Sequence, residues 1–542
     1  MERLIQEREE VILESYLKKF EAEACKTNNY HIQKKEKGDN MKKYILSIII
    51  GTAFLLLSGL AAAPLASAQI KLTNIELLGK YVFFDEISRP DERMACVTCH
   101  QPNTGGTGAD SKVNLHQVAI TGANPHTVGN LKPPTNAYAT LIGPFARDFS
   151  VFPSGYSGGN FWNGRAEGNE FPPEFPDGST KHIGNEIFYT TKGKLIPGVE
   201  VYAAYFGAVA DQALNPMPNP VEQNIPRKDV CKDVASAKYA PLYKLVWGVD
   251  INCSDDVVAI HAQDVLEERA FDISFKRLML AVCAWQDSAD LNSFSSKRDI
   301  ALAKEPDKQF PLRGFTDKEN LGHDLFYGKA GCTACHLSDK AHPDGTGQFE
   351  RYSDNGFHNI GVPPNPEIPE TFDAAGQFKD PDLGLFGHTG TIFVPLGVNN
   401  SLVPLDPKGM HKTATMRNVD KRPYKGFIKA YTHNGWFKSL ESIVHFYNTA
   451  AMQEDLAPLG IPKLHDVTRC PDNITTEKDA LANNCWPAPA YTNGTAIPFV
   501  IGNLGLTAEE EAAIVAYLKT LTDYYTPEEP PPYKPYKRPP CY

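Results

Sequence analysis

The sequence lacks any excess of positive charge. Its 542 residues include 54 Lys and Arg against 65 Asp and Glu, a formal net charge of −11 at pH 7. A chain with this balance is not expected to bind nucleic acid, and it has no basic patch for a membrane surface. The remaining composition, 42% hydrophobic and 22% charged, is typical of a globular protein. The length predicts two to four domains of about 150 residues each.

Residues 41–68 have the pattern of a secretory signal peptide. Two lysines after Met41 precede an apolar run at residues 44–60, and small residues lead to Ala68. The alternative is a retained membrane anchor, because the run approaches spanning length. We expect the signal to be cleaved after Ala68, so that the mature chain starts at Gln69 and keeps no membrane anchor. The mature protein is then expected in the periplasm. Residues 1–40 are then a non-native N-terminal extension from an over-long start site.

Two cysteine pentads carry the strongest signal. They are Cys96-Val97-Thr98-Cys99-His100 and Cys332-Thr333-Ala334-Cys335-His336. In this pattern each thiol adds to one vinyl group of haem, and the adjacent imidazole ligates the iron. Chance predicts about 0.006 such pentads in this chain, and the alternative, a zinc or redox Cys-x-x-Cys site, weakens with two copies. The pattern predicts two covalently bound haem c groups.

The other cysteines suit an oxidising compartment. Cys231 and Cys253 lie 22 residues apart, and Cys470 and Cys485 lie 15 apart, so each pair is a candidate disulfide among 15 pairings of the remaining six cysteines. Each would stabilise the fold by roughly 3 kcal/mol. Cys283, on an apolar helix face, is expected to be a buried thiol. The state of Cys541 stays open.

An internal duplication precedes the pentads. Leu-Gly begins a short amphipathic segment at residues 78–84 and again at residues 321–327, where Thr316 and Glu319 form a capping box. A helical pattern covers about 255–289, as one helix or two, and a last helix runs from Thr507 to about 522. We predict an N-terminal haem domain with inserts at 69–305, a C-terminal one at 306–525 and a Pro-rich tail at 526–542.

Five further stretches, in this order around two pentads, give the chain its resemblance to the bacterial di-haem cytochrome c peroxidase family, with its MauG branch. The resemblance covers roughly residues 78–521. The stretches are Phe-Trp-Asn-Gly-Arg-Ala at 161–166, Gln-Ala to Asn-Pro-Val-Glu at 212–222, Lys-Thr-Ala-Thr-Met-Arg-Asn at 412–418, His-Asn-Gly at 433–435 and Ser-Ile-Val-His-Phe-Tyr-Asn at 442–448.

The resemblance implies a mainly α fold with two cytochrome c-like domains side by side, rich in loops and with little sheet. It implies a periplasmic peroxidase that reduces hydrogen peroxide with electrons from a small cytochrome c or cupredoxin. One alternative is a MauG-like oxidase of a protein or organic substrate, and another is a non-catalytic di-haem electron carrier. The family is often dimeric, so a homodimer is one candidate assembly.

By position in the family, the N-terminal haem is the one that meets peroxide, with His100 as its proximal ligand. Gln212 and Glu222 match the pair over its open face, where a carboxylate moves the peroxide proton. The alternative for Glu222 is a solvated surface side chain. Trp162 matches a tryptophan between the haems, and its alternative is a core aromatic. His116 matches a distal histidine of the resting peroxidase, and His126 is its competitor.

The C-terminal haem is expected to relay electrons, with His336 as its proximal ligand. Its distal ligand is methionine in peroxidases and tyrosine in MauG, and the matching residue here is Tyr447. A phenolate would lower the haem potential. A core tyrosine is the alternative, with Met416 and Met452 as substitute ligands. His116 thus points to the peroxidase branch, and Tyr447 points to MauG.

The chain departs from the family at two places. About forty extra residues separate Arg165 from Gln212. The family binds calcium through an Asn and a Thr-x-Pro segment, whereas this chain has Lys132 and Ile-Lys-Ala at 428–430. Calcium needs oxygen ligands, so calcium is not expected, and Lys132 is a candidate electrostatic replacement for the ion.

Overall fold

The computed structural model describes residues 71–533, except 152, 169–194, 259–267, 305–310, 338–349, 369–381, 397–400 and 493–500. The expected N-terminal extension (1–40), signal peptide (41–68) and Cys541 lie outside the described residues, as does much of the insert between Arg165 and Gln212. The described residues belong to one compact unit.

The fold is mainly helical with little sheet, as predicted. The α-helices are α3 (Asn74–Phe84), α4 (Cys96–Cys99), α5 (Ser111–Leu115), α6 (Ala208–Ala213), α7 (Arg227–Ser236), α8 (Ala240–Trp247), α9 (Ala270–Asp287), α10 (Lys297–Lys304), α11 (Asp317–Tyr327), α12 (Phe386–Thr389), α13 (Leu440–Thr449), α14 (Gln453–Leu456), α15 (Glu477–Ala482) and α16 (Ala508–Lys519). The 3₁₀ turns are η2 (Pro102–Thr104), η3 (Ala139–Leu141), η4 (Glu200–Tyr205), η5 (Cys332–Ala334) and η7 (Ala457–Leu459).

The strands of the described chain form four two-stranded sheets. Three are antiparallel, namely β1 with β2, β3 with β6 and β4 with β5, while β7 and β8 are parallel. These strands are short, as the density of Gly and Pro predicts. They are β1 (Ala146–Arg147), β2 (Tyr156–Ser157), β3 (Phe357–His358), β4 (Ile392–Leu396), β5 (Ser401–Leu405), β6 (His411–Lys412), β7 (Thr468–Arg469) and β8 (Cys485–Trp486).

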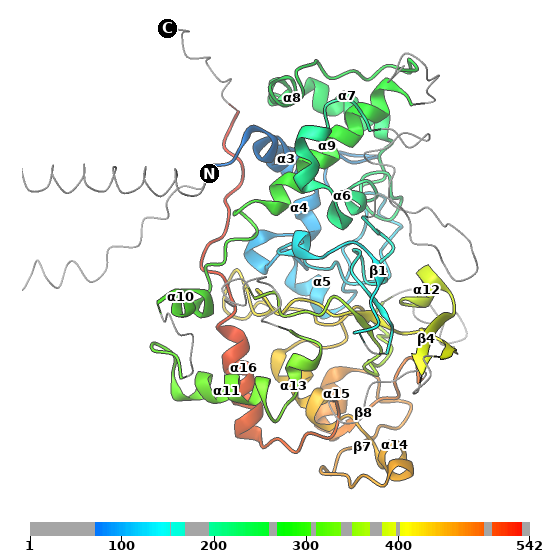
Figure 1. The fold of residues 1–542 in the computed structure, drawn as a ribbon, viewed down its shortest axis with the longest axis vertical. Coiled ribbons are helices and arrows are strands. Elements are labelled where there is room, and N and C mark those ends of the chain that lie inside the picture. The colour runs from blue at the N-terminus through cyan, green and yellow to red at the C-terminus, as the bar shows by residue number, and fades with distance from the viewer. Residues whose placement is uncertain are drawn as a thin grey trace, which may run out of the picture. The chain divides into compact units, whose positions relative to one another are not determined.

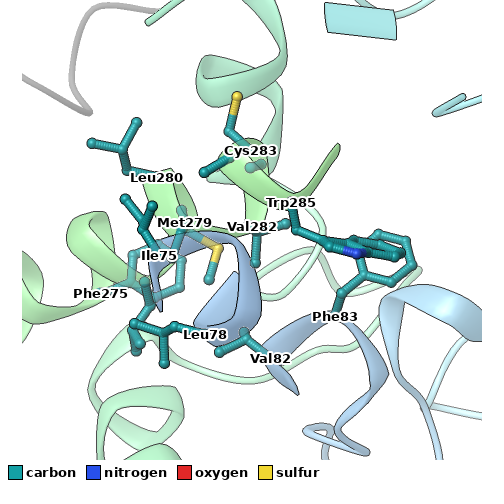
Figure 2. Close-up of a cluster of buried hydrophobic side chains, with 14 of the residues drawn as sticks. Ile75, Leu78, Val82, Phe83, Phe275, Met279, Leu280, Val282, Cys283 and Trp285 are labelled. Atoms are coloured by element: carbon teal, nitrogen blue, oxygen red, sulfur yellow. The ribbon is translucent and has the colours of Figure 1, made fainter. Parts of the chain in front are cut away.

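Helix α3 leads into the first pentad and packs against α9 (Figure 1). Its N-terminus is closed by a capping box between Thr73 and Glu76. Gly79 lets the two backbones meet, because a Cβ there would lie 1.8 Å from the carbonyl oxygen of Ala281. The apolar faces of both helices fill the first hydrophobic core, in which the ring centroids of Phe83 and Trp285 lie 4.6 Å apart (Figure 2).

Helix α11 repeats this arrangement before the second pentad. It begins with the predicted capping box of Thr316 and Glu319 and packs against α16. Gly322 is the contact point, because a Cβ there would lie 1.9 Å from the carbonyl oxygen of Ala513. These helices belong to a second hydrophobic core, formed by residues between 325 and 521. The duplication predicted from the sequence is therefore present in the helix pairs as well as in the pentads.

The long central helix is shorter than predicted. Helix α9 covers Ala270–Asp287, whereas residues 255–258 are not helical and Val257 forms a bridge with Arg269. The disulfide between Cys231 and Cys253 ties the preceding segment to α7. A covalent constraint therefore competes with the helical pattern there.

The stretch near 296–313, predicted as the boundary between the domains, contains α10. Two of its charged residues form buried ion pairs at 2.8 Å, Arg298 with Glu350 and Asp299 with Arg417. Both partners belong to the second half of the chain, so this part of the predicted boundary is packed.

The last helix, α16, starts after the predicted capping box of Thr507 and Glu510. The following residues are extended up to 533, and Tyr525 donates a hydrogen bond to Asp290 at 2.7 Å. Tyr81 of α3 donates to the carbonyl of Pro531. Among the described residues, no helix is both long and apolar enough to cross a membrane.

Candidate active site

Both pentads hold their histidine in the same way. The Nδ1 of His100 donates to the carbonyl of Gly106 at 2.9 Å, and the Nδ1 of His336 donates to the carbonyl of Tyr352 at 3.1 Å. A carbonyl can only accept, so the proton is on Nδ1 and Nε2 is left as a metal ligand. Burial lowers the pKa of both imidazoles, which keeps them neutral as ligands must be.

The four pentad cysteines are free, while the other predicted pairs are disulfides. Burial raises the pKa of Cys96, Cys99 and Cys332 to about 12, so these three stay protonated thiols in the haem-free chain. The sulfur atoms of Cys231 and Cys253 lie 2.06 Å apart, and those of the other predicted pair lie 1.97 Å apart. Cys283 is a buried thiol, as predicted.

The first pentad lines a cavity of about 60 Å³. Both predicted distal residues, Gln212 at the end of α6 and Glu222 in the following turns, line the same cavity as His100. Met279 and Gln286 of α9 line it as well. The sequence analysis missed these two, because a long helix without a local motif does not indicate which of its side chains reach a cavity.

Glu222 is held by its own turn. Asn219 donates from Nδ2 to Glu222 Oε1 at 2.7 Å, and its Oδ1 accepts from the Val221 backbone at 3.1 Å. No described residue donates to Oε2. Burial raises the pKa of Glu222, while the hydrogen bond from Asn219 and the charge of Arg165 oppose this shift. The carboxyl is therefore half-buried at the cavity wall, with one oxygen that accepts no hydrogen bond from a described residue.

The second pentad lines a larger cavity of about 200 Å³. Tyr447 of α13 and Met416 line it together with His336, whereas Met452 is buried in the hydrophobic core instead. Burial raises the pKa of Tyr447, so the haem-free side chain is a phenol. The remaining wall is largely aliphatic, including Ile360, Val362, Ile443, Val444, Ile501, Leu504, Leu506, Ile514 and Leu518.

Trp162 lies between the two cavities. It lines the second cavity and a small one of about 50 Å³, which shares Pro134, Thr135 and Asn160 with the first. Its indole Nε1 donates to the carbonyl of Lys132 at 2.8 Å. This position fits the predicted tryptophan between two haems. The indole is also buried, so the alternative, a core aromatic, fits as well.

His116 and His126 are both outside the cavities. The side chain of His116 is 68% exposed at the end of α5, and its Nδ1 lies 4.0 Å from Glu367. His126 is exposed in a loop. Neither lines the first cavity in this structure. A distal-ligand role for His116 would require the loop to move, and it stays a prediction.

The sequence analysis did not predict that His411 stacks on His433 at the second cavity, or that His411 and His358 each bond to a carboxylate. His411 and His433 stack with ring centroids 3.4 Å apart, and Asp382 bonds to the first of them at 2.6 Å. His358 bonds to Asp354 at 2.8 Å beside the second pentad. Burial lowers the pKa of His358, but its hydrogen bonds outweigh this and raise the pKa to about 10.

The residues present fit two haem groups. Each site combines two unpaired thiols, a histidine whose Nδ1 is bonded to a backbone carbonyl, and a cavity, which is the donor set for haem attachment and iron ligation. The residues do not fit calcium, because the ammonium groups of Lys132 and Lys429 are buried at the positions that the resemblance assigns to the ion.

Comparisons with known proteins point to one family. Residues 73–307 match the family model of the di-haem cytochrome c peroxidases. The methylamine utilization protein MauG of Paracoccus denitrificans (strain Pd 1222) is 26% identical over 469 residues, 85% of this chain and 92% of MauG. The cytochrome-c peroxidase IdrP2 of Denitromonas iodatirespirans is 33% identical over 155 residues, 27% of this chain and 36% of that protein.

A solved structure shares the fold. The diheme peroxidase BthA from Burkholderia thailandensis E264 gives a TM-score of 0.52 at 20% identity, covering 86% of this chain and 92% of BthA. The family match contains the first pentad and the Gln212 and Glu222 positions, and the MauG match extends over most of the remaining chain. Residues 73–307 therefore belong to the di-haem cytochrome c peroxidase family of oxidoreductases, and the similarity to MauG covers 85% of the chain.

Proposed function

We propose that the protein is a periplasmic peroxidase that reduces hydrogen peroxide at the site of the first pentad. Electrons come from a small cytochrome c or cupredoxin by way of the second site. The single observation that carries this proposal is Glu222, a half-buried carboxyl that shares a small cavity with His100 and whose pKa is raised by partial desolvation. A plain electron carrier has no need for a proton carrier at this place.

The residues of the first site have separate roles in the proposal. Glu222 takes a proton from the peroxide on Oε2 and returns it to the departing oxygen, while Asn219 holds Oε1. Gln212, which has both a donor and an acceptor, orients the peroxide. Haem, if attached to Cys96 and Cys99 and ligated by His100, would supply the metal centre, while two electrons from the donor protein and two protons from solvent would complete the reduction of hydrogen peroxide to two waters.

The second site is the electron supply. The wall around the second pentad is mostly aliphatic and, in the described chain, has no carboxylate among the residues that line it. His358, His411 and His433 line it as well. Its described wall nevertheless has no counterpart of the Gln212 and Glu222 pair, so we assign electron transfer to this site. Trp162, packed between the cavities, is placed to connect the two sites.

Replacing Glu222 by Gln tests the proposal. This change keeps the size of the side chain and removes its proton affinity, so peroxide turnover should fall by about 10²- to 10⁴-fold. Turnover is measured with a reduced small cytochrome as donor, and the visible spectra of both haems should remain as in the wild type. The matched control is Glu92→Gln, an exposed glutamate beside Arg89, which should leave turnover unchanged. Unchanged turnover in Glu222→Gln would favour the electron carrier.

A second candidate is a MauG-like oxidase of a protein or organic substrate. It is favoured by Tyr447, which shares the second cavity with His336, and by the exposure of His116. An electronic spectrum of the protein as isolated separates the two candidates. A high-spin signal present at once means that His116 does not ligate the iron, while one that appears only after half-reduction supports a peroxidase activated by departure of His116.

A further inference from the structure

Lys429 is buried in a cage of backbone oxygens. Its Nζ lies 2.8 Å from the carbonyl oxygen of Thr104, 3.0 Å from that of Lys421 and 3.2 Å from that of Asn418. The residue is 4% exposed. In the described chain no carboxylate lies within ion-pairing distance of it, and the nearest acidic influence is Asp420, which pairs with Arg422.

The cage requires a cation. Three carbonyl oxygens can only accept, and of the two forms of a lysine side chain only the ammonium has three N–H donors. Burial and the charge of Lys132 lower the pKa of Lys429, yet a neutral amine has only two N–H donors, so its lone pair would face the third carbonyl oxygen at close range. Converging carbonyl oxygens around a positive charge are also the ligand set that a hard metal ion uses.

The cage joins two distant parts of the chain beside the first pentad. Thr104 ends η2, four residues after His100, and Gly106, whose carbonyl holds the His100 imidazole, follows shortly. Asn418 and Lys421 belong to the second half. The two parts are also joined by a hydrogen bond that Asn114 donates to the carbonyl of Ile428 at 2.9 Å. A change in the cage would therefore reach His100 through one short loop.

We propose that the Lys429 ammonium is a tethered cation that replaces a metal ion in holding the His100 loop against the second half of the chain. Lys429 is then a positioning residue for the first haem site. Lys132 does not have this role, because its Nζ bonds to Thr107 Oγ1 and to the Pro133 carbonyl, outside the cage. When the side chain is shortened, the emptied cage becomes a site for an alkylammonium ion. This proposal does not depend on the peroxidase function.

Chemical rescue of Lys429→Ala in the haem-loaded protein tests it. The variant lacks three methylene groups and the ammonium, which n-propylammonium can supply. We expect a melting midpoint several degrees below that of the wild type and a changed spin-state spectrum of the first haem. n-Propylammonium should restore most of both in a saturable way, while choline at equal ionic strength should not. A variant with wild-type midpoint and spectrum, or one that loses both without rescue, overturns the proposal.

Two further variants separate charge from packing. Lys429→Met fills the volume without a charge, so it should be destabilised and insensitive to n-propylammonium. A Met variant as stable as the wild type overturns the proposal. Lys425→Ala is the matched control, because Lys425 is exposed in the same segment, and it should behave as the wild type.

Calcium titration of the wild-type holoprotein tests whether the cage binds a metal ion. It needs no variant, so it remains possible even if Lys429→Ala fails to fold. We expect no saturable calcium binding and no rise of the melting midpoint on addition of calcium. One tightly bound, stabilising calcium per chain would overturn the proposal. Neither readout uses peroxide turnover, so failure of the tethered cation and failure of the proposed peroxidase remain distinguishable.

Discussion

The histidines of the first and second pentads are held in the same way, but the two pentads line cavities of different size and polarity. Both imidazoles donate from Nδ1 to a backbone carbonyl. The first cavity, of about 60 Å³, contains Gln212 and Glu222, whereas the second, of about 200 Å³, is lined mostly by aliphatic residues and Tyr447. The anchoring motif therefore does not decide what a site does. The residues on the rest of the cavity wall decide it.

Removing one pair of pentad cysteines at a time tests the equivalence of the anchors. Each of two double variants should retain one haem per chain under denaturing conditions instead of two, because each pentad holds one haem. The variants are Cys96→Ala with Cys99→Ala, and Cys332→Ala with Cys335→Ala. The first pair should abolish peroxide turnover. The second should abolish turnover with a protein donor. Loss of all haem from the denatured wild type would contradict covalent attachment.

The pH profile of peroxide turnover tests whether the Glu222 carboxyl of the first cavity takes part in the reaction. Glu222 must be ionised to accept the peroxide proton, so turnover should fall as the pH drops through its pKa. Burial raises that pKa, and the acid limb should therefore lie at higher pH than the roughly 4.3 of an exposed glutamate. It is measured as turnover against pH, and the limb should disappear in Glu222→Gln. A limb that persists there would assign the titration to another group.

Exchange of Tyr447 tests the second cavity alone. In Tyr447→Met a thioether replaces the phenol, and we expect the potential of the second haem to rise by a measurable part of the roughly 0.8 V range that axial ligands cover. Spectroelectrochemistry resolves the two haems, and the first should keep its potential. The control is Tyr524→Met, a tyrosine that is 68% exposed. An unchanged potential for both haems would mean that Tyr447 is a packing residue.

The helix-crossing glycines test whether the two halves are built alike. Gly79→Ala and Gly322→Ala each place a methyl group within 2 Å of a backbone carbonyl oxygen, so each should destabilise the protein by about 3 kcal/mol. Thermal unfolding of the holoprotein measures the loss. Gly143→Ala meets no atom within 4 Å, and this control should change stability by less than about 0.5 kcal/mol. A large difference between the first two would contradict equivalent crossings.

His116→Ala should have the smallest effect. Because this side chain is 68% exposed and lies outside the first cavity, the variant should keep the spectrum and the turnover of the wild type. The spectrum is recorded for the fully oxidised protein. A new high-spin signal from the first haem in the variant would show that His116 ligates its iron in the oxidised state.

Features with local signals were predicted well. The capping boxes at Thr316 and Thr507 begin their helices as expected, because capping involves only a few neighbouring residues. The start of α9 was misplaced, since a disulfide and a bridge between Val257 and Arg269 act over a longer distance than a helical pattern. Met279 and Gln286 were missed for the same reason, because cavity walls depend on packing between helices.

The sequence by itself determined the two pentads, the four thiols and the spacing of Gln212 and Glu222, all of which are properties of residue order. Only the tertiary structure decided that Glu222 shares a cavity with His100, that His116 is exposed and that Lys429 lies among three carbonyls. These features depend on residues far apart in the chain, such as Thr104 and Asn418. Their proximity comes from packing, which no local pattern records.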